Sequence, residues 1–586
     1  MLATFVLILF RSVAFGRLDL CLLGGFAAFT AWTLASAAWS DSVPSTLDAA
    51  TRCLAYLSLV VVGLLLTRPR TSRHLLGGVL TGATLVCLYA LATRLLPGRV
   101  GSFDSVAGDY RLSSPVTYWN GLGVFAVMAL LLALTFAVRS HHVAVRAASA
   151  GMLPLLAATT YFTFSRGAWL ALAAGLIVAV AVDRHRLQLT AVGALLAIPT
   201  ALGIWLASRP DALRVRGSSL AAASAAGHRA LAELVLVALA GAAAGAAAYV
   251  AERRLAIPEF VRKVWATVLV VAVAGGIALV WTEKGSPVHE ARVVWTDFRH
   301  APKGGSANEQ SRLFNLSSNG RLHLWRVAWH SFRSSPLVGH GGGTFWQAWA
   351  ADPRHAFVAQ DTHDLYLQTL SEVGVLGLAI LLLALLTPVV AALRTRGRLT
   401  AGALAAYSAW LVHAAVDWDW QLLGVSALAV LVGVALVVRE RAANSRLPGT
   451  VRWPITAVSA VLAAVAFTTV MANVSLDRAV NAYAGGALAT ADRYARRAEV
   501  WNPWSSAPWD LRASIAARRG EAGAARKDMI SALHRDPHDW QLELRLALVS
   551  TGAERNAAFA AARLLDPHDV PKTIPPSLVR KWAAGR

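Results

Sequence analysis

The chain has 586 residues, of which 56% are hydrophobic and only 15% charged, and its formal net charge is +22. A soluble protein carries charge on about 25% of its residues, and the mean hydropathy here is +0.51. Composition therefore excludes an ordinary soluble domain. Many arginines fall in short loops beside apolar segments, which is typical of cytoplasmic anchoring and does not indicate a nucleic-acid partner.

Apolar segments long enough to cross a bilayer recur along the chain, and runs of this length predict helices because a helix satisfies its own backbone in lipid. We therefore predict an all-α polytopic membrane bundle of about 12–14 transmembrane helices. The candidate spans are 18–37, 51–66, 75–92, 118–138, 149–164, 168–182, 187–207, 231–250, 265–282, 368–393, 400–416, 421–438 and 454–472.

Loop charge predicts the orientation of these spans. Basic loops fall on alternate sides and come out cytoplasmic; they are 67–73, 139–146, 183–186, 252–263, 394–398 and 439–446. One loop disagrees, because 208–230 carries four arginines on the predicted outer side. We expect four parts: N-terminal transmembrane helices (1–282), a large extracytoplasmic loop (283–367), C-terminal transmembrane helices (368–472) and an extracytoplasmic helical region (473–586).

The last region changes character, with helical periodicity and no further apolar span. Asn502-Pro503, Asp536-Pro537 and Asp566-Pro567 recur 34 and then 30 residues apart. The first spacing is that of tetratricopeptide helix pairs. We predict a small helical-repeat domain that binds a partner or acceptor, with a plain helical tail as the alternative.

The stretch "QDTHDLYLQTLSEVGVLGLAILLLALL" places a histidine, His363, where a polar segment becomes a span. On a helix, His363 shares a face with Leu367, Leu370, Gly374 and Gly377, and these glycines let a neighbouring helix approach. The pattern predicts that His363 points into the bundle at its outer surface. An imidazole there suits general-base chemistry; a hydrogen-bonded core histidine is the alternative.

A second candidate helix follows Asn319-Gly320 and stops at Ser335-Pro336. Its first turn carries Arg321 on a face with three aromatic residues, which predicts an interfacial helix that presents Arg321 to a cavity. Cation–π packing on Trp325 is the alternative. The face with Arg326, His330 and Arg333 is typical of a solvated surface.

Three further motifs bear on chemistry. The Gly-rich loop "GHGGGTF" (339–345) allows backbone amides to approach a phosphate, or is a turn without a ligand. Arg166 in "TFSRGAW" lies at an outer helix end against the positive-inside bias, and snorkelling is its alternative interpretation. Asp417 and Asp419 are spaced as a divalent-metal pair, but a polar turn is commoner and we predict no metal site.

Segments 161–167, 317–345 and 362–377 resemble the O-antigen ligase and polymerase superfamily of bacterial surface-polysaccharide enzymes. The signature is a histidine and a small polar residue, then nine residues, then Gly-x-x-Gly. Here it comprises His363-Asp364, Gly374 and Gly377. Asp364 departs from the Asn, Ser or Gln that is more frequent in ligases.

The resemblance implies transfer of a polyprenyl-diphosphate-linked glycan to a hydroxyl of a lipid or glycan acceptor. Transfer would occur at the outer face of the cytoplasmic membrane, without metal or cofactor. By motif context His363, Arg321 and Arg166 would be the catalytic residues, with the arginines neutralising the diphosphate.

Further expectations follow for substrate contacts and for the reaction class. Asp364 would hold the imidazole or bind a sugar hydroxyl. We expect the other substrate-binding residues to be Arg326, His340, Gly341 and Gly342. A polymerase that uses a second lipid-linked glycan as acceptor is the near alternative. A lipid-linked glycan transporter is the far one, disfavoured because the polar candidates gather at one membrane face.

Overall fold

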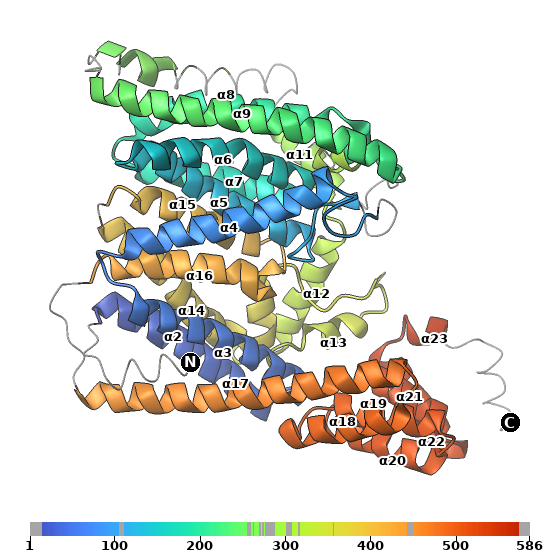
Figure 1. Ribbon diagram of the computed structural model, residues 1–586. Helices are drawn as coiled ribbons and strands as arrows, with labels where there is room; N and C mark the ends of the chain where they lie inside the picture. The colour runs from blue at the N-terminus through green and yellow to red at the C-terminus, as the bar shows by residue number, and fades with distance from the viewer. Residues whose placement is uncertain are drawn as a thin grey trace.

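A computed structural model of the chain describes residues 15–104, 110–254, 260–261, 263–268, 271, 275, 287–299, 307–314, 317–355, 357–395, 397–441 and 449–573. These residues form helices and connecting loops (Figure 1), so the prediction of an all-α fold is confirmed.

The bundle is built from helices that lie side by side in Figure 1. They are α2 (Arg17–Ala35), α3 (Val43–Leu66), α4 (Ser72–Leu95), α5 (Trp119–Arg139), α6 (Val143–Phe162), α7 (Arg166–Val182), α8 (Arg186–Ser208), α9 (Leu220–Arg254), α14 (Leu365–Arg394), α15 (Thr400–Ala414), α16 (Leu423–Val438) and α17 (Gly449–Ala484).

Eight helices among the described residues are long and apolar enough to cross a membrane: α2, α3, α4, α5, α6, α8, α9 and α14. Helices α7 and α16 are shorter apolar helices. Each predicted span coincides with or overlaps a described helix, except 265–282, of which the structure describes only residues 265–268, 271 and 275. The chain is a multi-pass membrane protein.

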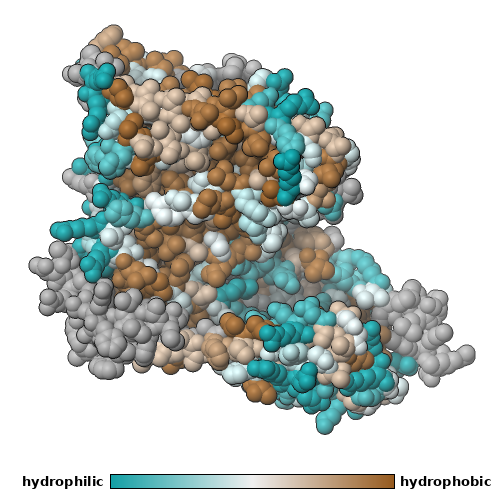
Figure 2. Space-filling model, in the orientation of Figure 1, coloured by the Kyte–Doolittle hydropathy of each residue, from teal (hydrophilic) through white to brown (hydrophobic). Residues whose placement is uncertain are grey.

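The surface and the core of the bundle differ as expected for a protein in lipid. Apolar side chains cover the middle of the bundle and polar side chains gather toward its two ends (Figure 2). Ile177, Ile198 and Leu236 are each exposed by two thirds or more. Helix α5 is apolar on all sides, as expected of a helix that its neighbours enclose. In its most apolar 18-residue stretch, 89% is buried.

Smaller helices occupy the connections at one end of the bundle. They are η1 (Ser36–Ala38), η3 (Asp211–Leu213), α11 (Pro287–Arg299), η4 (Glu309–Phe314), α12 (Arg321–Ser334), α13 (Phe345–Ala350) and η5 (Asp419–Gln421). We call this the site end. The predicted bounds of α12 are confirmed: Gly320, with a φ of 85°, is its N-cap and Ser335 its C-cap.

The loops that were predicted to be cytoplasmic lie at the opposite end of the bundle, which we call the basic end. Arg139 pairs with Asp183 at 2.7 Å, and Arg146 pairs with Glu252 at 2.7 Å. Arg441 bonds Asp19 at 2.6 Å and donates to the carbonyl oxygen of Thr67. These contacts confirm that the basic loops lie together. Their location in the cytoplasm stays a prediction.

The arginine-rich loop 208–230 lies at the site end despite its charge. The amide of Glu309 donates to the Arg214 carbonyl oxygen at 3.0 Å, so this loop lies beside part of the long loop 283–367. Arg214 pairs with Asp211, and Arg216 pairs with the fully buried Glu309. Two arginines of this loop are thus neutralised by nearby carboxylates. The loop is an exception to the charge rule, and the predicted alternation of the spans still holds.

Helix α17 runs the length of the bundle and continues past residue 472, the predicted end of the membrane segment (Figure 1). The C-terminal region then packs each helix against the next: α18 (Leu488–Trp501), α19 (Ala507–Arg518), α20 (Ala522–Leu533), α21 (Trp540–Val549), α22 (Gly552–Leu565) and α23 (Val570–Thr573). The three Asx-Pro pairs follow α18, α20 and α22, which indicates a two-helix period. The tetratricopeptide assignment and its partner stay predictions.

Two of those Asx-Pro pairs contact the bundle at the site end. Ser42, the N-cap of α3, donates through Oγ to Asp536 Oδ2 at 3.0 Å. His355 Nε2 lies 3.2 Å from Asp566 Oδ1. Both aspartates are buried. The repeat that marks the C-terminal region thus also supplies carboxylates that hold it on the membrane domain.

Candidate active site

The centre of the site is Asp417, in the turn between α15 and η5. Its side chain is 1% exposed, yet it accepts from three distant side chains, Arg321 Nη2, Tyr118 OH and Asn120 Nδ2, each at 2.7 Å. Its neighbour Trp418 donates its amide at 2.8 Å. Burial alone would raise the pKa of Asp417, but Arg321 and His363 hold it well below its ordinary value. Asp417 is therefore an anion that positions its neighbours.

His363 is one of those neighbours. Its Nδ1 lies 3.3 Å from Asp417 Oδ1, and its side chain is 24% exposed. An ionised carboxylate only accepts, so Nδ1 carries the proton and Nε2 keeps its lone pair. Nε2 has no hydrogen-bond partner in the described part of the chain. A partly exposed imidazole with one nitrogen fixed and the other open is suited to accept a proton.

The predicted helical face through His363 is wrong. His363 has a φ of 57° and lies before α14, whose N-cap is Asp364. Asp364 Oδ1 accepts from the amides of Tyr366 and Leu367 at 2.9 and 3.0 Å. The left-handed backbone turns the imidazole out of the helix direction, toward Asp417. Thus Asp417, and not Asp364, holds the imidazole, and Asp364 fixes where the helix begins.

Arg321 is placed by α12 and by charge. It is the first residue of that helix, on the side of the buried residues Leu324 and Ala328. It pairs with Asp417 and makes no cation–π contact with Trp325 among the described residues. Burial opposes its charge, yet Asp417 raises its pKa above the ordinary value. Arg321 is therefore a fixed cation next to His363.

Arg166 lies at the N-terminus of α7, half-buried, with Ser165 as N-cap. Arg321 and Arg312 are the charges that act on it most strongly. Arg166 has no hydrogen bond or ion pair with any described residue. A helix N-terminus adds positive potential at the same place. A half-buried cation beside two others, without an acid of its own, is suited to bind an anionic ligand.

A buried Asp–His pair supports the position of Arg166. His413 Nδ1 lies 3.1 Å from Asp419 Oδ1, and both side chains are at most 1% exposed. A methyl group on Gly167 would come within 2.9 Å of His413 Nε2. Glycine therefore allows α7 to approach α15 closely enough to bring Arg166 into the site.

The Gly-x-x-Gly motif places the loop after α12 against α14. Gly374 has a φ of 71° inside α14 and breaks its regular backbone. The freed groups bond that loop instead: Val375 donates to the Pro336 carbonyl oxygen at 2.9 Å, and Gly341 donates to the Glu372 carbonyl oxygen at 2.8 Å. A methyl group on Gly374 would meet the Leu337 carbonyl oxygen at 2.1 Å. Gly374 therefore serves backbone exchange, whereas Gly377 lies against α2, where a methyl group would come within 3.2 Å of Trp32.

The other predicted substrate residues are not brought to Asp417. His340 pairs with Asp41 Oδ2 at 3.2 Å, and this hydrogen bond raises the pKa of His340. The amides of Gly341 and Gly342 donate to Glu372 and to Ser36 Oγ. Arg326 lies exposed on the outer face of α12. Their roles in substrate binding stay predictions.

An apolar cavity lies beside the site, between α2, α3, α14, α15 and α16. Its walls include Phe29, Leu365 and Trp420, and Gly342 also borders it. Leu365 is two residues from His363, and Trp420 is three from Asp417. The cavity therefore places an apolar surface next to the charged cluster.

Comparison with known families matches a part of the chain that includes some of these residues. Residues 220–382 match the family model described as O-antigen ligase. The chain carries a domain of the O-antigen ligase superfamily. A search of curated proteins gave no match. The O-antigen ligase domain includes Arg321, His363 and the Gly-x-x-Gly motif, whereas Arg166 and Asp417 lie outside the matched residues. The match indicates a membrane glycan transferase of O-antigen ligase or polymerase type, which implies lipid-linked glycan substrates.

Sequence reasoning missed the role of Asp417 and its partners Tyr118 and Asn120. The motif "VDWDWQ" was a signal, since two acids stand at a predicted helix end. It was interpreted as a polar turn, with a metal pair as the less favoured alternative, because the arginine and histidine that use Asp417 lie 96 and 54 residues away. Arg111, which bonds Asn120 Oδ1 at 2.9 Å and the Thr163 carbonyl oxygen at 2.8 Å, carried no signal.

Proposed function

We propose that this protein transfers a polyprenyl-diphosphate-linked glycan to a hydroxyl group of an acceptor at the outer face of the cytoplasmic membrane. The single observation that carries this proposal is the Asp417 cluster. One buried carboxylate joins a proton acceptor, His363, to a cation, Arg321, and Arg166 lies nearby without an acidic partner. Glycan transfer from a diphosphate needs a base and an anion site at the same place.

The donor's diphosphate would bind between Arg166 and Arg321. Guanidinium groups stay protonated and donate two parallel hydrogen bonds to phosphate oxygens. Because Asp417 already neutralises Arg321, the unpaired Arg166 supplies most of the uncompensated charge. The polyprenyl chain would lie in the apolar cavity that Phe29, Leu365 and Trp420 line.

In the reaction, the acceptor hydroxyl would give its proton to His363 Nε2 as its oxygen bonds the anomeric carbon. The bond between that carbon and the phosphate oxygen would break, and its electron pair would leave with the polyprenyl diphosphate. Asp417 stabilises the imidazolium that forms, and the arginines stabilise the leaving diphosphate. Displacement from the opposite side inverts the anomeric configuration.

The experiment uses the detergent-purified protein with an extracted polyprenyl-diphosphate glycan and an acceptor pool. We expect release of polyprenyl diphosphate by the wild type and none above background by His363→Ala. His330→Ala, an exposed histidine on α12, is the matched control and keeps full activity. Equal release by the wild type and His363→Ala contradicts the proposal.

The glycan product separates ligase from polymerase. A product whose reducing end is joined to a lipid acceptor indicates a ligase, and one joined to another lipid-linked glycan indicates a polymerase. We expect chelation of metal ions to leave release unchanged, since two arginines supply the charge that a metal ion would otherwise bring. Loss of release in the chelator would overturn that part.

A further inference from the structure

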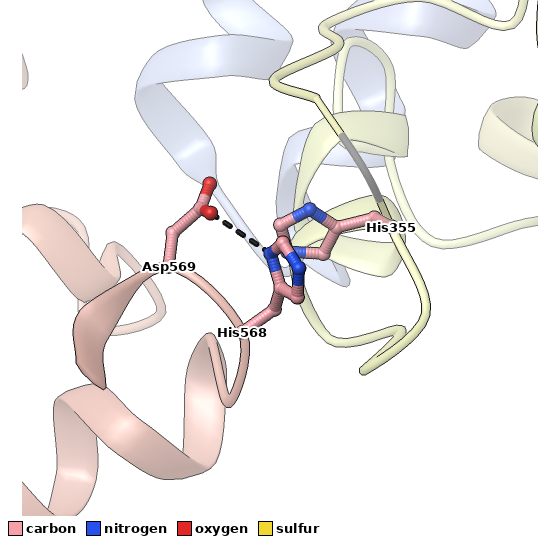
Figure 3. A group of neighbouring side chains, drawn as sticks. All are labelled: His355, His568 and Asp569. Atoms are coloured by element: carbon pink, nitrogen blue, oxygen red, sulfur yellow. Dashed lines mark hydrogen bonds and ion pairs between the residues drawn. The ribbon is translucent and has the colours of Figure 1, made fainter. Parts of the chain in front are cut away.

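A second cluster of titratable side chains lies at the junction between the C-terminal region and the membrane domain (Figure 3). His355 belongs to the loop that follows α13, and His568 and Asp569 belong to the connection between α22 and α23. One ligand atom from each of the three lies within 4.8 Å of the others. The functions of Arg166, Arg321 and His363 do not involve this cluster.

We propose that His355, His568 and Asp569 bind one divalent transition-metal ion of the zinc type. Two imidazole nitrogens and one carboxylate oxygen are the ligand set that zinc and its neighbours prefer, whereas magnesium and calcium prefer oxygen alone. Three protein ligands leave one tetrahedral position for water.

Burial and hydrogen bonding at His355 support this site. The His355 side chain is 1% exposed, and its Nε2 lies 3.2 Å from Asp566 Oδ1. Its Nδ1 is buried and has no partner among the described residues. An unpaired buried nitrogen is costly in a folded protein. Histidines that bind metals are commonly held by a carboxylate in this way, so the ring has binding capacity that the protein does not use.

Two side chains beside His568 bear on metal binding: Asp569 as a second ligand and Lys572 as a competing cation. Its Nδ1 lies 2.9 Å from Asp569 Oδ1, so the two prospective ligands already face each other. Lys572 Nζ lies 2.6 Å from His568 Nε2. The lysine is exposed and able to move aside. Its positive charge would oppose a bound cation, which makes Lys572 a sensitive probe of the site.

A metal ion at this site would link two parts of the chain. His355 precedes His363 by eight residues on the same loop, whereas His568 and Asp569 belong to the C-terminal region. A metal ion would join these two parts of the chain at the buried contact between His355 and Asp566. It would therefore restrain the segment that leads into the active site without taking part in glycan transfer.

The test is a titration of the full-length protein in detergent with zinc chloride after chelation, followed by calorimetry. We expect one ion per chain in the wild type and in His534→Ala, an exposed histidine on the same region. The double variant His568→Ala with Asp569→Ala should bind at least roughly tenfold more weakly. Lys572→Ala should bind more tightly than the wild type.

A second measurement keeps the test independent of folding. His568 and Asp569 are each 23% exposed, so their replacement leaves the packed core of the region intact. Zinc should slow hydrogen exchange in residues 351–361 and 566–573 of the wild type and not of the double variant. Equal affinity of the wild type and the double variant, or no binding by the wild type, overturns the site.

Discussion

The basic end of the helix bundle and the candidate site hold their arginines in different ways. At the basic end, Arg139, Arg146 and Arg441 are each nearly buried and each paired with a carboxylate. In the candidate site, Arg166 is half-buried without such a partner among the described residues, and Arg321 shares its partner with His363. Paired arginines anchor loops. An arginine held in place without an acid is suited to supply charge to a ligand, and this is the basis for proposing Arg166 as a site residue.

The largest expected effect is on transfer activity at the site end. Arg166→Ala should lower the rate of polyprenyl diphosphate release by roughly 10²–10³-fold, since it removes a donor to the developing charge. Its melting temperature should stay within error of the wild type, because no protein partner is lost. Arg166→Lys should recover part of the rate. Arg333→Ala, exposed at the end of α12, is the control. Normal release by Arg166→Ala would break the comparison.

At the basic end we expect a loss of stability and no loss of transfer activity. Arg139→Ala removes the guanidinium group that bonds Asp183 and Gln188, and breaking a buried ion pair costs roughly 3–5 kcal/mol. Thermal unfolding in detergent should show this loss, while release per folded molecule stays normal. Arg184→Ala, exposed in the same loop, should leave stability unchanged. An Arg139→Ala variant that is as stable as the wild type would show that these pairs do not anchor the loops.

The two glycines of the Gly-x-x-Gly motif should differ in their effect on stability. Gly374→Ala should destabilise the protein by roughly 1–3 kcal/mol, because its backbone is left-handed and a methyl group meets the Leu337 carbonyl oxygen. Gly377→Ala meets mainly the Val373 side chain and should cost less. Differential unfolding of the two variants measures this. Equal effects would mean that the motif acts through helix packing after all.

The smallest expected effect is on docking of the C-terminal region, which α17 keeps tethered. Burial raises the pKa of Asp536 to about 7, with the Ser42 hydrogen bond acting against it. A carboxyl with a raised pKa favours docking while protonated, so docking should be strongest below about pH 4 and weaken as pH rises through 7.

Hydrogen exchange in residues 36–46 and 530–540 between pH 5 and pH 8 follows this change. Asp536→Asn should make exchange there less dependent on pH, because the amide stays neutral. Exchange that slows as pH rises would have the wrong sign for this explanation.

Much of the fold was predictable because it depends on local patterns. Apolar length predicted the helices, and Asn319-Gly320 with Ser335-Pro336 predicted the ends of α12. Loop charge grouped the basic loops correctly. Loop charge alone would have placed loop 208–230 on the cytoplasmic side, because the carboxylate that neutralises Arg216 belongs to Glu309, 93 residues away.

The candidate site was easier to predict in its members than in its geometry. Motifs pointed to His363, Arg321 and Arg166, and the fold brings His363 and Arg321 to one carboxylate, while their catalytic roles stay predictions. The helical face through His363 failed because Asp364 caps α14 and leaves His363 in a left-handed turn. Asp417 was taken for a turn residue or metal ligand, since only the folded chain brings Tyr118, Arg321 and His363 to it.

In the proposed mechanism, Asp417 acts on His363 directly. A double-mutant cycle on polyprenyl diphosphate release, with Asp417→Asn, His363→Ala and the double variant, measures this coupling. If Asp417 serves transfer by holding the imidazole, the double variant should be about as slow as the slower single variant. If the two losses multiply, Asp417 and His363 act independently, and the interpretation of the cluster as one base and its positioning carboxylate is contradicted.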